Sequence, residues 1–145
     1  MSKNTDERVT PQELFDLLHK EFKFETDLAA SHQNAKLPNY YHLGNSALTK
    51  KWIGSNFLNP PYSELKYWLY YGSQQKALIV WILPTDTSTK WFHNYIYDRH
   101  KWNWRLNIKV RFPLGRFKFS NSNAAKFASM IVIMDNRIDQ DELAK

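Results

Sequence analysis

The residues Asn59-Pro60-Pro61-Tyr62 directly follow a short predicted strand, Ser55 to Leu58, and their types suit them to chemistry. Consecutive prolines have no backbone N–H and a fixed φ, so their carbonyl groups are held outward. An amide beside such carbonyls can accept the hydrogens of an amino group, while a tyrosine ring offers a flat heterocycle a face for stacking. The motif predicts a site that steers an aryl amine toward an electrophile. A proline turn with a buried tyrosine is the structural alternative.

A second candidate, Asp27, ends another predicted strand, Phe24 to Asp27. Ligands of open α/β sheets bind beyond the carboxyl ends of the strands, so we expect Asp27 and Asn59 at one edge. The segment Leu28 to Lys36 could open a helix, and Asp27 would then be its N-cap. The residues alone leave both roles open, and one side chain can fill both.

The elements that must position these residues follow from hydrophobic spacing and from breakers. We expect Thr10 as N-cap, Pro11 as first residue and Glu13 as capping-box acid of a helix that reaches about Lys23. Two more predicted helices cover 63–71, ending at Gly72, and 90–98. Predicted strands cover 24–27, 55–58, 77–83, 105–112, 116–119 and 127–134, with a loop at 38–48 and a turn at 113–115.

The order of these elements predicts the fold class. Ala77 to Leu83 is apolar throughout, which is typical of a strand buried on both faces of a parallel sheet, whereas 105–112 alternates like a half-exposed strand. Helices alternating with strands, then two successive strands, indicate an α/β chain with a mostly parallel sheet, an antiparallel pair at one side and helices on both faces. We expect one domain over 1–145, with flexible tails at 1–9 and 136–145.

Positive charge is concentrated in a basic window, Arg99 to Lys118, of a chain whose formal net charge is +6. The window has no acid and is interleaved with Trp102 and Trp104, and on a hairpin it would suit phosphate contacts and stacking on bases. Basic side chains on an exposed strand can also serve only to protect an edge from aggregation. The residues expected to contact a nucleic acid are Arg99, Lys101, Arg105, Lys109, Arg111, Arg116 and Lys118.

Several classes of protein do not fit the sequence. The absence of cysteine excludes disulfides and thiolate metal sites, and it fits a cytoplasmic location. His93 and His100 are not spaced with carboxylates as metal ligands, so we expect no metal. The first residues lack the order of a signal peptide, and the longest apolar run, Ala77 to Leu83, is too short to cross a bilayer. We therefore expect no membrane partner, and no motif indicates an oligomeric state.

Asn-Pro-Pro-Tyr after a strand is the catalytic motif of amino-methyltransferases, and the chain resembles the small phage-type DNA N-6-adenine-methyltransferases, a Dam-like family. The resemblance runs from Thr10 to about Met134, and the order and spacing of its elements are more specific than any one of them. The elements are Thr10-Pro11 with Leu14-Phe15, FETDLAAS at 24–31 with NAK at 34–36, Trp52 before FLNPPYS at 57–63, Leu83-Pro84 before TKWFH at 89–93, GRFKF at 115–119, and Ser129-Met130.

This resemblance implies a reduced S-adenosylmethionine-dependent methyltransferase (Rossmann-like) fold that uses S-adenosylmethionine as cofactor and DNA as partner. Asp27 would hold the methionine or adenosyl part of the cofactor. The amide of Asn59 and the Pro60 carbonyl would receive the target amine, and Tyr62 would stack on the base. The cofactor-binding residues so implied are Thr10, Pro11, Asp27, Ala29, Ala30 and Asn59, and the catalytic residues are Asn59, Pro60, Pro61 and Tyr62.

By the same resemblance, a methyl group would pass directly from the sulfonium to the exocyclic amino nitrogen of an adenine flipped out of DNA. The setting would be the cytoplasm of a bacterial host, with the gene carried by a phage or prophage. Two alternatives stay open. The amine could belong to cytosine or to a protein glutamine, because those methyltransferases share the motif. The chain could also be a catalytically silent DNA-binding relative.

Overall fold

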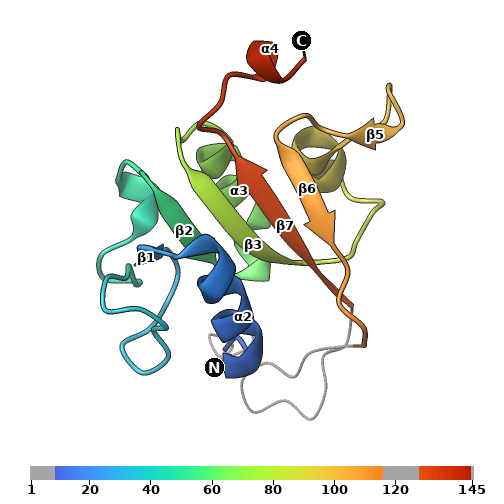
Figure 1. Cartoon of the computed structure of the whole chain (residues 1–145). Helices are drawn as coiled ribbons and strands as arrows, with labels where there is room; N and C mark the ends of the chain where they lie inside the picture. The colour runs from blue at the N-terminus through green and yellow to red at the C-terminus, as the bar shows by residue number, and fades with distance from the viewer. Residues whose placement is uncertain (1–8, 116–127, 145) are drawn as a thin grey trace.

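Helices and strands alternate along the chain, as expected for the α/β class. The computed structural model describes residues 9–115 and 128–144 (Figure 1). Its elements are α2 (Gln12–Phe22), β1 (Thr26–Asp27), the 3-10 helices η1 (Ala47–Thr49) and η2 (Tyr62–Glu64) on either side of β2 (Ser55–Leu58), α3 (Leu65–Ser73), β3 (Leu78–Pro84), the π-helix η3 (Phe92–Ile96), β4 (Tyr97–Asp98), β5 (Asn103–Trp104), β6 (Ile108–Arg111), β7 (Ser129–Asp135) and α4 (Gln140–Leu143).

The main sheet has five strands in the order β1-β2-β3-β7-β6. The pairs β1/β2 and β2/β3 are parallel, whereas β7 is antiparallel to both of its neighbours, β3 and β6. Strand β7 is therefore the one strand of this sheet that runs against the others. The mostly parallel sheet and the antiparallel strands at one side are confirmed. A separate two-stranded sheet joins β4 to β5.

Helices cover both faces of the main sheet, as predicted. Helix α2 packs on one face through Phe15 and Leu18, while α3 and η3 cover the other (Figure 1). Strand β3 contributes to both cores, with Leu78, Val80 and Ile82 toward α2 and Ile79, Trp81 and Leu83 toward α3. All six side chains are buried, which confirms a strand covered on both faces.

The start of α2 differs from the prediction. The helix begins at Gln12, Pro11 occupies the N-cap position with ψ of 133°, and no side chain caps the helix. Thr10 is not the N-cap and Glu13 does not close a capping box. The Thr10 hydroxyl instead contacts Asn59, 49 residues away. The predicted end near Lys23 is confirmed, because Lys23 is the C-cap in the left-handed conformation.

The helix predicted from Leu28 to Lys36 does not form. The backbone turns there, and Ser31 and Asn34 bond to each other's backbone, with Ser31 N donating to Asn34 Oδ1 at 2.7 Å and Asn34 N donating to Ser31 Oγ at 3.2 Å. Such local bonds compete with helix formation. Asp27 therefore caps no helix. Part of the loop expected at 38–48 runs beside β1 as an added parallel segment, since Asp27 N donates to the Asn39 carbonyl at 3.0 Å and Tyr41 N to the Asp27 carbonyl at 2.9 Å.

Other predicted boundaries also shift. The helix expected at 90–98 becomes the π-helix η3 and then strand β4, and the strand expected at 105–112 is regular only over β6. Asn136, placed in the predicted C-terminal tail, is fixed by hydrogen bonds from its backbone N to the Ala77 carbonyl and from Nδ2 to the Gly72 carbonyl, both 3.0 Å. The segments 1–8 and 116–127, including the strand expected at 116–119, lie outside the described residues.

Gly72 does not end α3 as predicted, since the helix continues to Ser73. A Cβ atom at Gly72 would lie 2.7 Å from the Trp81 ring and 3.0 Å from the Trp52 ring. Both rings are fully buried, and the Trp52 indole N–H donates to the Ala47 carbonyl at 2.8 Å. The glycine is needed because α3 approaches the aromatic core closely.

We predict that Gly72→Ala lowers the free energy of unfolding by roughly 1–3 kcal/mol, because overpacking two fixed indole rings outweighs the gain in helix propensity. Urea denaturation followed by circular dichroism measures the change. Ser73→Ala, at the next and exposed position, is the matched control and should alter stability little. A Gly72→Ala protein more stable than wild type would contradict the close approach.

Candidate functional site

Asn59 lies at the carboxyl end of β2 with its side chain almost completely enclosed. The residue is 5% exposed, and its Nδ2 donates to Thr10 Oγ1 at 2.9 Å. Thr10 is 3% exposed and immediately precedes Pro11 and α2. The segment before the first helix thus holds the asparagine amide in one orientation. Its oxygen is the atom able to accept a hydrogen from an amine.

The rest of the motif forms a rigid turn between β2 and α3. Pro60 is buried, and Pro61 is extended with φ of −61° and ψ of 127°. The Pro61 carbonyl accepts the Glu64 N–H at 3.2 Å and so starts η2. Tyr62 is half-buried and packs against the core on the α3 side. Its hydroxyl oxygen is enclosed, so packing holds the ring, while the residue as a whole is only partly covered, as a stacking platform requires.

Asp27 is a buried carboxylate at the end of β1. The residue is 2% exposed, and its Oδ2 accepts the Lys36 backbone N–H at 3.1 Å. Burial raises the pKa of Asp27 from 3.8 to about 6, against the smaller lowering effect of the Lys36 and Ala29 backbone amides and the Lys36 charge. No cationic side chain within the described ranges lies in ion-pair contact with it. The environment thus disfavours the ionised carboxylate unless a cation joins it.

The sheet register brings these residues to one edge. Asp27 is level with Phe57 of β2, two residues before Asn59. Strand spacing and rise then put the Asp27 and Asn59 Cα atoms roughly 8 Å apart. After β1 the chain lays residues 39–41 along one side of β1 and β2 along the other, so its winding reverses at β1. Open α/β sheets bind ligands at such a reversal, beyond the carboxyl ends of the strands.

The smaller residues expected at the site lie at the same edge. Leu28 N donates to the Phe57 carbonyl and Ala30 N to the Tyr41 carbonyl, both at 2.9 Å, so Ala29 and Ala30 continue β1 between its two neighbours. Pro11 accepts the Phe15 N–H at 3.1 Å and starts α2 directly after Thr10. Sequence reasoning missed the pairing of residues 39–41, although two adjacent tyrosines after Pro38 favour an extended segment.

Two of the basic residues expected to contact DNA are bonded within the fold. Arg111 makes a bidentate ion pair with Glu21 at 2.7 and 2.6 Å, and Arg105 donates to the His93 carbonyl at 2.6 Å. Lys109 is exposed on β6, whereas Arg99 and Lys101 are exposed between β4 and β5. Figure 1 shows that strand β5 lies beside the beginning of β6. Arg116 and Lys118 are outside the described residues.

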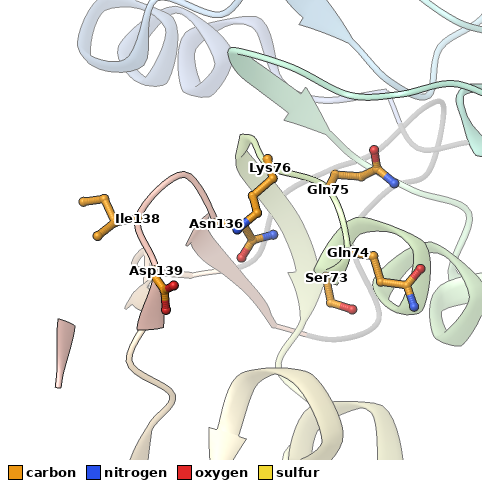
Figure 2. A pocket seen from close by; sticks show the side chains of 7 residues that line it. All are labelled: Ser73, Gln74, Gln75, Lys76, Asn136, Ile138 and Asp139. Carbon is orange, nitrogen blue, oxygen red and sulfur yellow. The ribbon is translucent and has the colours of Figure 1, made fainter. Parts of the chain in front are cut away.

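A shallow polar depression of about 240 Å³ lies at the opposite edge of the sheet, around the start of β3 and the end of β7 (Figure 2). Its lining includes Gln75, Lys76 and Asn136. Gln75 Oε1 accepts the backbone N–H of Trp52 at 3.0 Å, and Asn136, just after β7, donates to the Gly72 carbonyl of α3. These amides therefore have structural partners. Because it lies at the opposite edge of the sheet, the depression is remote from Asp27 and Asn59.

Neither a metal centre nor a membrane span is found in the described part of the chain. No three His, Cys, Asp or Glu side chains gather there in a way that could hold a metal ion. No helix within 9–115 and 128–144 is both long and apolar enough to cross a membrane.

Comparison with known proteins gives a consistent result. A family model described as DNA N-6-adenine-methyltransferase (Dam) matches residues 1–143. A DNA N-6-adenine-methyltransferase of Escherichia phage T1 is 34% identical over an alignment of 90 residues that covers 57% of this chain and 37% of the phage protein. Another, from Haemophilus phage HP1 (strain HP1c1), is 29% identical over 111 residues, 72% of this chain and 64% of that protein. The chain thus spans less than two thirds of either relative.

The buried Asp27 leads to a prediction for stability. Because its folded pKa is raised, the native state holds a proton between pH 4 and 6 that the unfolded state has released, so the stability of the ligand-free protein falls as pH rises through that window. Above pH 6 the penalty amounts to at most about 3 kcal/mol. Asp27→Asn should therefore raise the melting temperature at pH 7 but barely alter it at pH 4. The control Glu13→Gln, an exposed acid, should show no such difference, and an Asp27→Asn protein less stable at pH 7 would contradict the assignment.

Proposed function

This chain belongs to the DNA N-6-adenine-methyltransferase (Dam) family, and we propose that it transfers a methyl group from S-adenosylmethionine to the exocyclic amino nitrogen of adenine in DNA. One observation carries the proposal: Asn59 is held by Thr10 at the end of β2, beside the buried carboxylate that ends β1. The polypeptide would adopt a reduced Rossmann-like methyltransferase fold and act in the cytoplasm of a bacterial host.

The residues around Asp27 fit S-adenosylmethionine, which supplies an electrophilic methyl group on a cationic sulfur. Burial disfavours the charged form of this carboxylate, and no cationic side chain among the described residues is in ion-pair contact with it. The approach of a sulfonium or ammonium group would therefore stabilise it. Thr10 and Pro11 would border this pocket from the segment just before α2. Ala29 and Ala30 would border it from the end of β1, where small side chains leave room close to the backbone.

Asn59 and the Pro60 carbonyl would accept the two amine hydrogens, which points the nitrogen lone pair at the methyl carbon. When bound, the cofactor would give up its methyl group to the amine nitrogen and keep the electron pair of the broken C–S bond, so positive charge would develop on that nitrogen. The amide and carbonyl oxygens stabilise that charge, and the extra proton leaves to solvent afterwards. Tyr62 would hold the ring plane by stacking. Fixing nucleophile and methyl group in line accounts for much of the rate.

The adenine must leave the duplex to reach this edge, because its amine is otherwise engaged in pairing. We assign contacts with the phosphate backbone of DNA to the exposed Arg99, Lys101 and Lys109. Arg105 and Arg111 are committed to bonds within the fold and are no longer expected to contribute much.

We predict that Asn59→Ala abolishes methyl transfer while S-adenosylmethionine still binds, because the amide acts on the amine and not on the sulfonium. Transfer is measured with labelled S-adenosylmethionine and unmethylated DNA, followed by digestion to identify the modified base, and binding is measured by calorimetry. Asn94→Ala, an exposed amide elsewhere, is the control. Near wild-type transfer by Asn59→Ala would disprove the role, and a modified base other than adenine would disprove the substrate.

Asp27→Ala should weaken S-adenosylmethionine binding at least tenfold, or about 1.4 kcal/mol, because it removes the anion facing the cofactor. In the wild type the affinity should be highest above pH 6 and fall by up to about tenfold per pH unit below it, since the carboxylate is then protonated. Calorimetry between pH 5 and 7.5 measures this, and Asp27→Asn should remove the pH dependence. Unchanged affinity in Asp27→Ala would leave the carboxylate with a structural role alone.

A further inference from the structure

We propose that the turn Tyr40–Asn45 contacts the DNA duplex and that Leu43 at its tip is a wedge, which fills the gap left in the base stack by the extruded adenine. The inference rests on the proposed function and adds an element that enters the DNA. It concerns residues that neither the Asn-Pro-Pro-Tyr motif nor the basic window includes.

The register places this turn at the mouth of the site. Tyr40 is level with Asp27 on one side of β1, and Phe57 is level with Asp27 on the other. Two residues further along their parallel segments, His42 and Asn59 lie at the same height. They are two strand spacings, or about 10 Å, apart. A side chain just beyond His42 is therefore within reach of a nucleotide whose base occupies the site at Asn59.

The turn is tight and presents one apolar side chain. His42 N donates to the Asn45 carbonyl at 3.2 Å and Asn45 N to the His42 carbonyl at 3.0 Å, so only Leu43 and Gly44 form the tip. Leu43 is 94% exposed. A lone exposed leucine is ordinary on a protein surface, but one on a short hairpin-like tip beside a base-binding site has the form of the apolar wedges that open base steps.

Rings at its base make the tip stiff. The His32 and His42 ring centroids are 4.4 Å apart, His32 Nδ1 is hydrogen-bonded to the Tyr40 hydroxyl, and Gly44 N donates to His42 Nδ1 at 3.2 Å. A wedge needs such support, because a mobile side chain would lose its entropy on insertion. The imidazole and phenol rings also offer stacking faces to neighbouring bases.

The charge around the turn favours a polyanion. No Asp or Glu occurs from Leu28 to Ser63. Lys36 lies at this edge, since its backbone N–H donates to Asp27 and its Nζ donates to Gln12 Oε1 of α2 at 2.9 Å. Exposed acidic residues lie on α2, at Glu13 and Asp16, and after the motif at Glu64, so the duplex should approach from the side of the turn.

The test compares paired with unpaired DNA, because a wedge is needed only where a base must leave the stack. Labelled S-adenosylmethionine is supplied with an unmethylated random-sequence duplex and with the same DNA denatured to single strands. Leu43→Ala should lower transfer to the duplex about tenfold and transfer to single strands by less than about twofold. Leu43→Met should retain most duplex activity. Anisotropy should show the same duplex-specific loss in binding, and calorimetry should show unchanged cofactor affinity. Leu17→Ala, an exposed leucine on α2, is the control.

Equal duplex transfer by Leu43→Ala and wild type would overturn the wedge and leave the proposed function intact. Equal losses on duplex and single strands would also overturn it, because they would indicate a general defect. A wild-type protein that methylates neither form of DNA would overturn the proposed function, and the wedge with it.

Discussion

The double pairing of strand β3 is the constraint on which the rest of the structure depends. Its residues pair in parallel with β2 and antiparallel with β7, and its side chains fill the cores on both faces. The pairing of Leu58 with Trp81 fixes where β2 ends, and so fixes the position of Asn59. The same Trp81 ring sets how closely α3 can approach, which is why Gly72 lies opposite it. One buried strand thus determines both the packing of α3 and the height of the motif at the sheet edge.

The sequence predicted those parts of the fold that depend on local hydrophobic pattern. The run at β3, the strand before Asn59 and the end of α2 are confirmed because apolar burial and a left-handed C-cap are encoded locally. The prediction of a helix after Asp27 was wrong. The Ser31 and Asn34 side chains bond to nearby backbone there, and Tyr40 pairs with β1. The partner of Thr10 could not be foreseen, since it lies 49 residues away. The ion pair of Arg111 with Glu21 could likewise not be foreseen, because the two residues lie 90 positions apart in the sequence.

The burial of Asp27 at the edge of the sheet lowers the stability of the ligand-free protein and also prepares this carboxylate for its proposed role. Backbone bonds to residues 39 and 41 on one side, and β2 on the other, hold β1 so firmly that it can carry a buried carboxylate. The environment that raises its pKa would, under the proposed function, favour a cationic ligand, because a neutral ligand would not relieve the unfavourable charge. The short strand is therefore supported from both sides at the residue where the proposed function needs rigidity.

The bond between Thr10 and Asn59 also bears on how the protein folds. Strands β2, β3 and β7 pair with one another without any contribution from α2, the first helix of the described residues. The amide of Asn59 gains its partner only when Phe15 and Leu18 have packed and carried Thr10 to the sheet edge. The pairing of β3 with β7 joins residues comparably far apart in the sequence, so both contacts are slow to form. In refolding experiments, the site should accordingly be assembled only once α2 has docked on the sheet.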